Sequence, residues 1–338
     1  MLTIYNDQHV LHQGKVEMFR GELVPCFEVP ARVDHVRHEL ERRGVGRLQA
    51  PDAFDEALLA RVHAPRYLDF IAHAWDEWVA LDPSNVSRDA LPSYWPTRGM
   101  RTDVLPKSFP ARMGLFSFDA GTPLMAGSWS AARHGAACAW TAAQRVIGGQ
   151  RAAFALTRPP GHHAGFVNNA AVAAQALRDA GVERVAVLDV DYHHGNGTQA
   201  IFYERDDVHF ASLHGDPLTD YPYYLGHADE RGAGRGEGFN HNLPLSRGTD
   251  FPTWRAALKT ALARIAEVKA GALVVSLGVD TFEGDPISGF KLKSDDYLRM
   301  GEDLARAGLP TVFVFEGGYA VAEVGVNAVN VLEGFEQA

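Results

Sequence analysis

Two aspartates and two histidines stand within six residues at the end of an apolar run, as Asp189, Asp191, His193 and His194. The apolar run over residues 184–188 predicts a buried strand. Because alternate residues of an extended chain face the same side, we expect the first three of these side chains to point one way. Carboxylates and imidazoles presented together are typical ligands of a divalent metal ion. Asp189, Asp191 and His193 span too great a length along the chain for all three to bind one ion. One of them should therefore orient a metal ligand instead of binding the metal.

A strand end with solvated polar residues is the simpler interpretation of this run. The Gly-Asn-Gly sequence at residues 195–197, directly after so dense a set of polar groups, argues against it. Three further predicted strands also end in unusual polar residues. They are followed by Thr157 to His163, by Gly278 to Phe282 and by Glu316 to Tyr319. Each ending alone fits a turn or a helix cap. Sites in parallel sheets form beyond the carboxyl ends of the strands, so together the four endings predict one site.

Asp191, His193 and Asp280 are the expected metal ligands. Two carboxylates and one imidazole balance the charge of a divalent ion and leave room for water and substrate. Such an ion lowers the pKa of bound water toward about 7 and polarises a carbonyl group. These ligands therefore predict hydrolytic chemistry.

His162 and His163 are the candidate general bases, since a nearby imidazole can take a proton from water and return it to a leaving amine. Each needs an orienting partner on its far nitrogen, and Asp189 and Asn196 are suitably placed. Tyr319 follows two glycines, which we expect to act as a flexible hinge, and its hydroxyl can donate to a developing oxyanion. Metal, base and oxyanion donor together predict amide hydrolysis.

The bulk composition narrows the partners. The 338 residues include 42 acidic and 32 basic side chains, a net charge of −10, which argues against nucleic acid and suits a cationic small molecule. Cys26 and Cys138 have no disulfide or zinc-knuckle spacing. Apolar runs long enough to span a bilayer and a signal-peptide pattern are both missing from the sequence, so we expect a cytoplasmic protein with no membrane partner.

Strands and helices alternate over most of the chain, which predicts an α/β fold with a mostly parallel sheet covered by helices on both faces. The expected strands cover residues 2–5, 152–156, 184–188, 208–213, 272–277 and 311–315. The expected helices cover residues 32–43, 55–62, 65–78, 129–147, 169–180 and 253–270, with another capped by Ser294. Residues 15–30 are expected to be irregular.

The regular pattern is interrupted between residues 80 and 122. Prolines punctuate this stretch, with Tyr94 and Trp95 between them. It is too long for an ordinary loop in a compact domain. Its aromatic residues favour an insertion used for dimerisation or for shaping a pocket over a poorly ordered segment.

Five motifs, in this order along the chain, resemble the arginase–deacetylase fold. The resemblance covers nearly the whole chain, including its opening segment through Gly21 to Pro25. The motifs run from Pro159 to His163, Leu188 to Thr198, Ser212 to Asp216, Gly278 to Pro286 and Glu316 to Tyr319. They are similar to the zinc-dependent histone deacetylase family and its bacterial branch, the acetylpolyamine amidohydrolases. The resemblance implies a single catalytic domain over residues 1–338, with residues 80–122 as an insertion for homodimerisation and a narrower mouth.

The resemblance also implies cofactors. Asp191, His193 and Asp280 would hold Zn²⁺, with Fe²⁺ or another divalent ion as the alternative. A structural K⁺ would lie beneath it and bind largely through backbone oxygens, as hard cations prefer. The residues of that potassium site would be Asp189, Asp191, His193, Ser212 and Leu213.

The roles of other residues follow from the same resemblance. His163 would be the likelier general base, with Asn196 as its partner, and Asp189 would pair with His162. Tyr319 would polarise the scissile carbonyl. The substrate channel would have Tyr221 as an aromatic wall and Glu17 as an acidic residue at the mouth that suits a polyamine.

This sequence departs from the family pattern at two places. Roughly eight residues of a glycine-rich loop with a second aromatic wall are missing between His163 and Asn168. Either this deletion opens the channel on one side and leaves Tyr221 with no aromatic opposite, or the full enzyme contains loop residues beyond the printed sequence. An acidic residue common in the branch near Pro110 is also absent, which weakens the polyamine assignment.

The leading hypothesis is therefore a zinc amidohydrolase that removes acetyl or related acyl groups from primary amines such as N-acetylpolyamines. An acyl-lysine or another N-acyl amine is the second choice of substrate. From another class, the chain could be a metal-containing binding protein whose catalysis is impaired by the shortened loop. A ureohydrolase-like enzyme of the same fold would need a second metal and more carboxylates than the sequence offers.

Overall fold

The core of the molecule is a parallel sheet of eight strands, seen in a computed structural model that describes residues 1–163 and 165–338. The strand order is β4-β1-β5-β10-β9-β6-β7-β8, and every neighbouring pair is parallel. The strands are β1 (Leu2–Ile4), β4 (Arg47–Gln49), β5 (Ala152–Ala155), β6 (Val185–Asp189), β7 (Val208–Gly215), β8 (Asn240–Leu245), β9 (Ala272–Leu277) and β10 (Thr311–Phe315). This sheet confirms the predicted fold class.

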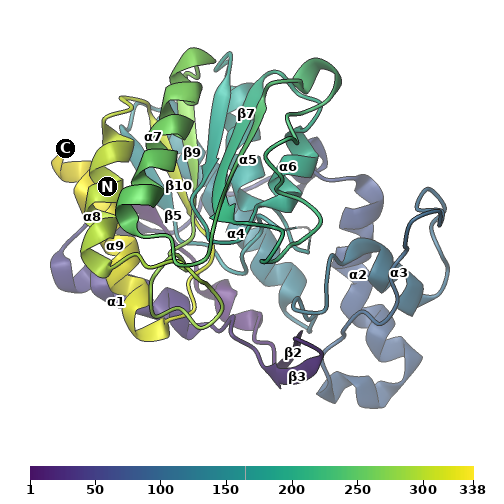
Figure 1. Cartoon of the computed structure of the whole chain (residues 1–338). Helices are drawn as coiled ribbons and strands as arrows, with labels where there is room; N and C mark the ends of the chain where they lie inside the picture. Colours follow the sequence, from purple (N-terminus) through teal and green to yellow (C-terminus); the bar gives the residue numbers. More distant parts are fainter. Residues whose placement is uncertain (164) are drawn as a thin grey trace.

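Helices cover both faces of the sheet (Figure 1). One layer contains α1 (Ala31–Arg43), α7 (Phe251–Glu267), α8 (Ser294–Ala305) and α9 (Val321–Gln337), and the other contains α4 (Ser128–Ile147), α5 (Asn169–Asp179) and α6 (Asn196–Phe202). In β6, Ala186 and Leu188 pack into the first layer, and Val185 and Val187 into the second. A central strand buried on both faces is apolar throughout for this reason.

Several local predictions were wrong. Residues 15–30 contain a hairpin of β2 (Val16–Phe19) and β3 (Glu22–Pro25), joined by antiparallel pairing. The helix expected over residues 55–62 is the 3₁₀ helix η2 (Glu56–Arg61). Ser294 begins α8 but does not cap it, because the N-cap is Lys293. The remaining short helices are η1 (Asp7–Leu11), η3 (Pro83–Ser87) and η4 (Gly234–Gly236).

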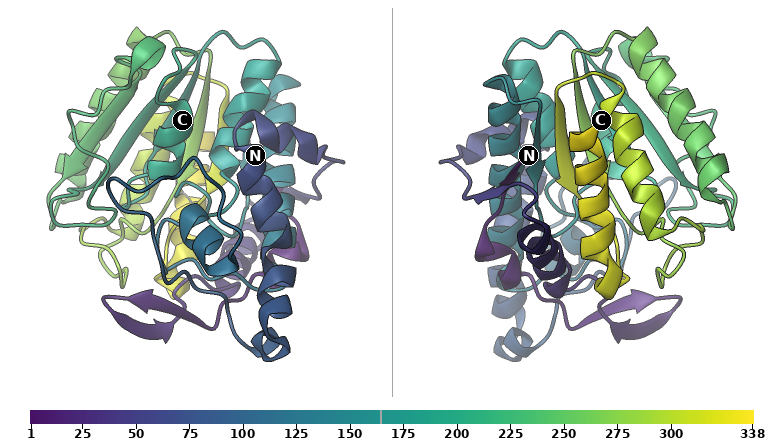
Figure 2. Two further views of the ribbon diagram at one scale, coloured as in Figure 1. Left: turned by 90° about the vertical axis from the view of Figure 1, so that its right-hand side faces the viewer. Right: turned by 90° about the vertical axis from the view of Figure 1, so that its left-hand side faces the viewer.

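The proline-rich insertion and the hairpin project from the body of the molecule (Figure 2). The insertion contains η3 and α3 (Phe109–Phe116), and it follows α2 (Pro65–Leu81). This region has a small core of its own, formed by Phe70, Ile71, Ala74, Ala90, Phe109, Met113, Leu124 and Phe166. The Met18 N–H donates to the Ala120 carbonyl at 3.0 Å and so joins the hairpin to the insertion. The insertion is therefore a packed structure beside the carboxyl edge of the sheet.

No helix in residues 1–163 and 165–338 combines the length and hydrophobicity that a membrane-spanning segment requires.

Candidate active site

The run of aspartates and histidines leaves the sheet earlier than the sequence suggested. Strand β6 ends at Asp189, and the residues after it form turns. The Asp189 carboxylate accepts the Asp191 N–H at 3.1 Å, and the Asp191 carboxylate accepts the His193 N–H at 2.8 Å. Each aspartate thus closes a turn on the residue two positions later. Turn geometry, rather than strand alternation, brings these side chains together.

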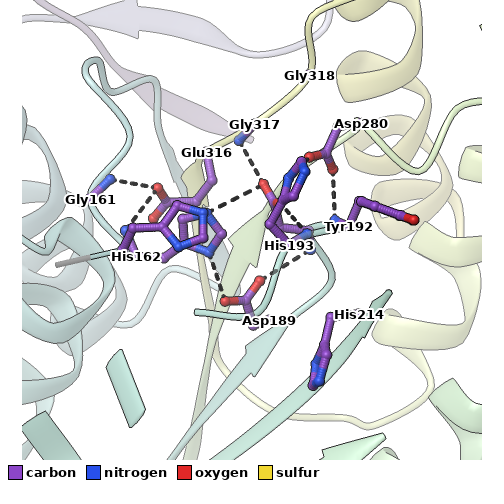
Figure 3. A network of polar contacts seen from close by, with 12 residues as sticks. Gly161, His162, Asp189, Tyr192, His193, His214, Asp280, Glu316, Gly317 and Gly318 are labelled. Atoms are coloured by element: carbon purple, nitrogen blue, oxygen red, sulfur yellow. Dashed lines mark hydrogen bonds and ion pairs between the residues drawn. The ribbon is translucent and has the colours of Figure 1, made fainter. Parts of the chain in front are cut away.

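Asp191, His193 and Asp280 form a compact buried cluster whose ligand atoms all lie within 4.8 Å of one another. His193 Nδ1 is 2.9 Å from Asp280 Oδ2 and 3.4 Å from Asp191 Oδ1. Asp280 reaches the cluster from the loop after β9, and its other oxygen accepts the Tyr192 N–H at 2.7 Å. The Gly317 N–H donates to Asp191 Oδ2 at 2.8 Å, from the loop after β10 (Figure 3). Three strand ends therefore build the cluster.

The charges of this cluster fit a divalent cation. Burial and the neighbouring Asp191 carboxylate raise the pKa of Asp280 to about 8, because two anions cannot share a buried site without a cation. A divalent ion would neutralise both carboxylates and accept the imidazole as a third ligand. The donor set therefore suits the metal that the sequence predicted.

The two tandem histidines lie in different electrostatic environments. His162 Nδ1 is 3.0 Å from Asp189 Oδ2. Burial opposes its charge, but the carboxylates of Asp191 and Asp189 raise the pKa of His162 to about 10. His163 Nδ1 is 2.7 Å from Asn196 Oδ1, and burial holds the pKa of His163 well below its usual value. An amide oxygen only accepts hydrogen bonds, so neutral His163 carries its proton on Nδ1 and keeps Nε2 free as a base.

The backbone of the histidine pair is held from both sides. Glu316 Oε2 accepts the N–H groups of Gly161 at 2.8 Å and of His162 at 3.4 Å. The His162 carbonyl accepts the N–H groups of Gly197 at 2.9 Å and of Thr198 at 3.2 Å, at the start of α6. Helix α6 begins at Asn196, within the Gly-Asn-Gly sequence, and its first turn orients the histidine loop.

The glycines before Tyr319 do not form the flexible hinge that we expected. A Cβ on Gly317 would lie 2.4 Å from Asp191 Oδ2, and Gly318 has a φ of +131°, so glycine is required by close approach and by backbone conformation. Arg32 Nε donates to the Gly318 carbonyl at 2.6 Å, and the guanidinium lies 4.7 Å from the centre of the Tyr319 ring. The backbone of residues 317–319 is therefore held in place by these contacts. Burial also raises the pKa of Tyr319 well above its usual value, so its hydroxyl remains a donor.

A cavity of about 400 Å³ opens onto these groups. Its lining includes His163, His193, Tyr319, Tyr221, Phe166, Glu17 and Asp119. Tyr221 lies 5.0 Å from His163 between ring centroids and 5.6 Å from Phe118, which packs on it edge to face. Phe118 of the insertion is thus an aromatic neighbour of Tyr221. The expectation that no aromatic ring stands opposite Tyr221 across the channel stays a prediction. Residue 164 of the shortened loop lies outside the described residues.

Glu17 lines the cavity from the β2–β3 hairpin and is only 8% exposed. The Phe27 N–H donates to its carboxylate at 3.1 Å. Burial raises the pKa of Glu17 to about 7. Within residues 1–163 and 165–338 Glu17 forms no ion pair, and a buried acid of this kind gains from a cation in the cavity.

The residues expected to bind K⁺ comprise Asp191 and His193 of the metal cluster, Asp189, and two residues of strand β7. Asp189 pairs with Ser212 in the sheet register, and all five are buried. The Ser212 hydroxyl also contacts His214 Nδ1 at 2.8 Å. The structure thus places Asp189 at the end of β6, Asp191 and His193 just after it, and Ser212 and Leu213 within the adjacent strand β7.

Four residues near the site were missed by the sequence reasoning. These are Arg32, Phe118, Asp285 and Glu316. Asp285 and Glu316 stand inside motifs that were recognised, but their roles as acceptors of backbone N–H groups depend on loops distant in sequence. Arg32 was predicted only as the first residue of a helix over residues 32–43, and its side chain is fully buried.

This chain is similar to known proteins over nearly its whole length. The family model of the histone deacetylase domain matches residues 26–335. Acetylpolyamine amidohydrolases 1 and 2 of Pseudomonas aeruginosa are both 52% identical to this chain, and the alignments cover 100% and 99% of it and 99% of each relative. A crystal structure of an acetylpolyamine aminohydrolase from Burkholderia pseudomallei superposes with a TM-score of 0.94 at 37% identity, covering 99% of this chain and 98% of that one.

One of these alignments is longer than this chain. The alignment with amidohydrolase 1 extends over 347 positions, more than the 338 residues of this chain. That relative therefore has internal residues that this chain lacks.

Proposed function

The chain belongs to the histone deacetylase family, and from this premise we propose that it removes acetyl or related acyl groups from primary amines of the N-acetylpolyamine type. One observation carries the proposal. A single cavity is lined by His193 of the buried metal-type cluster, by the neutral base His163 and by the protonated donor Tyr319. Binding alone needs neither a base nor an oxyanion donor.

The chemistry divides among these residues. Asp191, His193 and Asp280 would hold a divalent ion, which when bound supplies Lewis-acid polarisation of a carbonyl and makes water more acidic. His163 Nε2 takes a proton from the attacking water and passes it to the amine nitrogen as the C–N bond breaks. Tyr319 donates a hydrogen bond to the oxygen on which negative charge develops. The products are a carboxylate and a free amine.

We propose Zn²⁺ as the ion, with Fe²⁺ as the alternative, because two carboxylates and one imidazole suit a catalytic site with open positions. The K⁺ would bind through the five residues named above, largely by backbone oxygens. Asp189 would belong to that site and also orient His162, which explains its complete burial beside the metal ligands.

The acidic cavity supports a cationic substrate. Glu17 lines it, the chain has a net charge of −10, and the P. aeruginosa relatives are named for acetylpolyamines. An acyl-lysine remains the second candidate, because Pro110 stands where the branch often has an acid. Turnover of acetyl-lysine peptides with none of mono-N-acetylated diamines would favour that alternative.

A Glu17→Gln variant is expected to raise KM for a mono-N-acetylated diamine about tenfold, because a hydrogen bond between charged groups contributes roughly 1.5–3 kcal/mol. KM for an uncharged N-acetyl amine should change little. Steady-state kinetics with both substrates measure the difference. Glu22→Gln, on the exposed strand of the same hairpin, is the matched control. Equal effects on both substrates would remove Glu17 from amine recognition.

The insertion is proposed to form a homodimer through Tyr94 and Trp95, whose side chains are 68% and 38% exposed. The same region exposes further apolar side chains, those of Leu81, Val86, Met100, Val104 and Leu105. Hydrophobic residues scattered singly on a surface need no explanation, but so many exposed apolar residues in one segment suggest an interaction site. Light scattering at micromolar concentration should give twice the chain mass, and Tyr94→Asp should give a monomer. Ile147→Asp, on an exposed residue of α4, is the control. A monomeric wild type would contradict the proposal.

A further inference from the structure

We propose that Asp285 is a positioning residue for Tyr319, which sets the place of the oxyanion donor relative to the metal cluster. This inference rests on the proposed function, in which Tyr319 acts during hydrolysis. Asp285 is not assigned a role by the motif that contains it, and among the described residues it belongs neither to the lining of the cavity nor to the metal cluster.

The contacts of Asp285 are all to backbone N–H groups. Its Oδ2 accepts from Tyr319 at 2.7 Å and from Ala320 at 3.3 Å, and its Oδ1 accepts from Ile287 at 3.1 Å. The side chain is 8% exposed. The two Oδ2 donors precede the first residue of α9, where the helix dipole also favours a carboxylate. A buried anion bound by three N–H groups holds them more rigidly than a neutral acceptor would.

The loop after β9 carries both the metal ligand Asp280 and the positioning residue Asp285. Asp280 and Asp285 lie five residues apart after β9, and the Val279 N–H donates to the Gly317 carbonyl at 2.9 Å. The loop after β9 is thus joined to the loop after β10 at Gly317, the first glycine of the pair, and again at Tyr319 and Ala320. One loop therefore carries a metal ligand and also restrains the position of Tyr319 relative to the cluster.

Arg32 of helix α1 supplies another restraint on Tyr319. It donates to the Gly318 carbonyl and stacks on the tyrosine ring, but it makes no contact with the Tyr319 N–H. Without Asp285, the two N–H groups at residues 319 and 320 lose their acceptor. The hydroxyl would then leave the place where charge develops, and catalysis is sensitive to displacements of about 1 Å.

A double-variant cycle tests this inference. Asp285→Ala should lower kcat about 10–100-fold, with little change in KM and full metal content. Combined with Tyr319→Phe, it should lower kcat no further than Tyr319→Phe alone, because the hydroxyl that it positions is already absent. A role limited to fold stability would instead multiply the two effects. A multiplicative result overturns the inference.

Two further variants serve as controls, one for misfolding and one for the loss of a buried carboxylate at a helix start. Asp285→Asn keeps the volume and one oxygen, so it should fold and lose less kcat, with the same lack of additivity. Amide exchange at residues 319 and 320 should be faster in it than in the wild type. Asp296→Ala is the matched control, since Asp296 also accepts a backbone N–H at a helix start, from Lys293 at 2.8 Å. It should leave kcat unchanged in both backgrounds.

The outcomes separate this inference from the proposed function. A wild type that turns over no acylated amine defeats the proposed function, and this inference with it. An active wild type whose Asp285 and Tyr319 effects multiply, or whose exchange at residues 319 and 320 does not change, defeats only the inference.

Discussion

An Asp280→Ala variant is expected to lose its divalent metal and at least about 10³-fold in turnover. Asp280 supplies one of three ligands, and its removal leaves Asp191 and His193 without the charge balance that a divalent ion requires. The metal contributes several kcal/mol of transition-state stabilisation, which corresponds to that loss of rate. Elemental analysis after gel filtration measures the metal, and an acetate-release assay measures the turnover.

The control for this variant is Asp303→Ala. Asp303, on helix α8, is also a buried aspartate, but it forms ion pairs with Arg255 and Arg306. That variant should lose stability and keep its metal. Full metal content in Asp280→Ala would show that the ion binds elsewhere and would remove the cluster from the mechanism.

Replacing Tyr319 by phenylalanine should lower kcat about 10²–10³-fold, the usual cost of one oxyanion donor. The ring stays on the Arg32 guanidinium, and its backbone N–H stays on Asp285, so the fold and the metal cluster should be unaffected. Metal content and the affinity for a metal-chelating hydroxamate should therefore match the wild type. Steady-state kinetics give kcat, and calorimetry gives the affinity.

Tyr224→Phe is the matched control, because Tyr224 is 83% exposed on the loop after Tyr221. It removes the same hydroxyl from a solvated ring and should leave kcat unchanged. A near-normal kcat for Tyr319→Phe would exclude its hydroxyl from the reaction. Weaker hydroxamate binding with lost metal would instead indicate that the substitution disturbed the cluster.

The convergence of the site was predictable from sequence because strand ends are local signals. Apolar runs mark the parallel strands, and the polar residues just after them must meet at one edge. Asp191, His193 and Asp280 come together on this ground alone. The ring partners of His162 and His163 were also correctly paired, with Asp189 and Asn196.

The restraints on the site were not predictable, because they join segments that are distant in sequence. Arg32 on α1 reaches the loop at Gly318, and Glu316 reaches the backbone at Gly161. Neither contact leaves a periodic pattern in the chain. The two glycines before Tyr319 resembled a hinge for the same reason, since only the packed structure shows the Asp191 oxygen that lies against Gly317.

The insertion shows a further limit of the sequence reasoning. Its prolines and aromatic residues predicted an excursion with a function, but its contacts depend on tertiary packing. Phe118 reaches Tyr221, and Ala120 accepts a hydrogen bond from the hairpin. The sequence therefore did not indicate that the insertion supports Tyr221, a residue of the cavity lining.

The most direct test is acetate release from a mono-N-acetylated diamine by one preparation in three states. The account predicts turnover with the Zn²⁺-loaded enzyme, loss of turnover after treatment with a chelator, and recovery when Zn²⁺ is restored. Binding of the acetylated diamine by the metal-loaded enzyme without release of acetate would contradict the account, because the cavity would then be a binding site and not a site of hydrolysis.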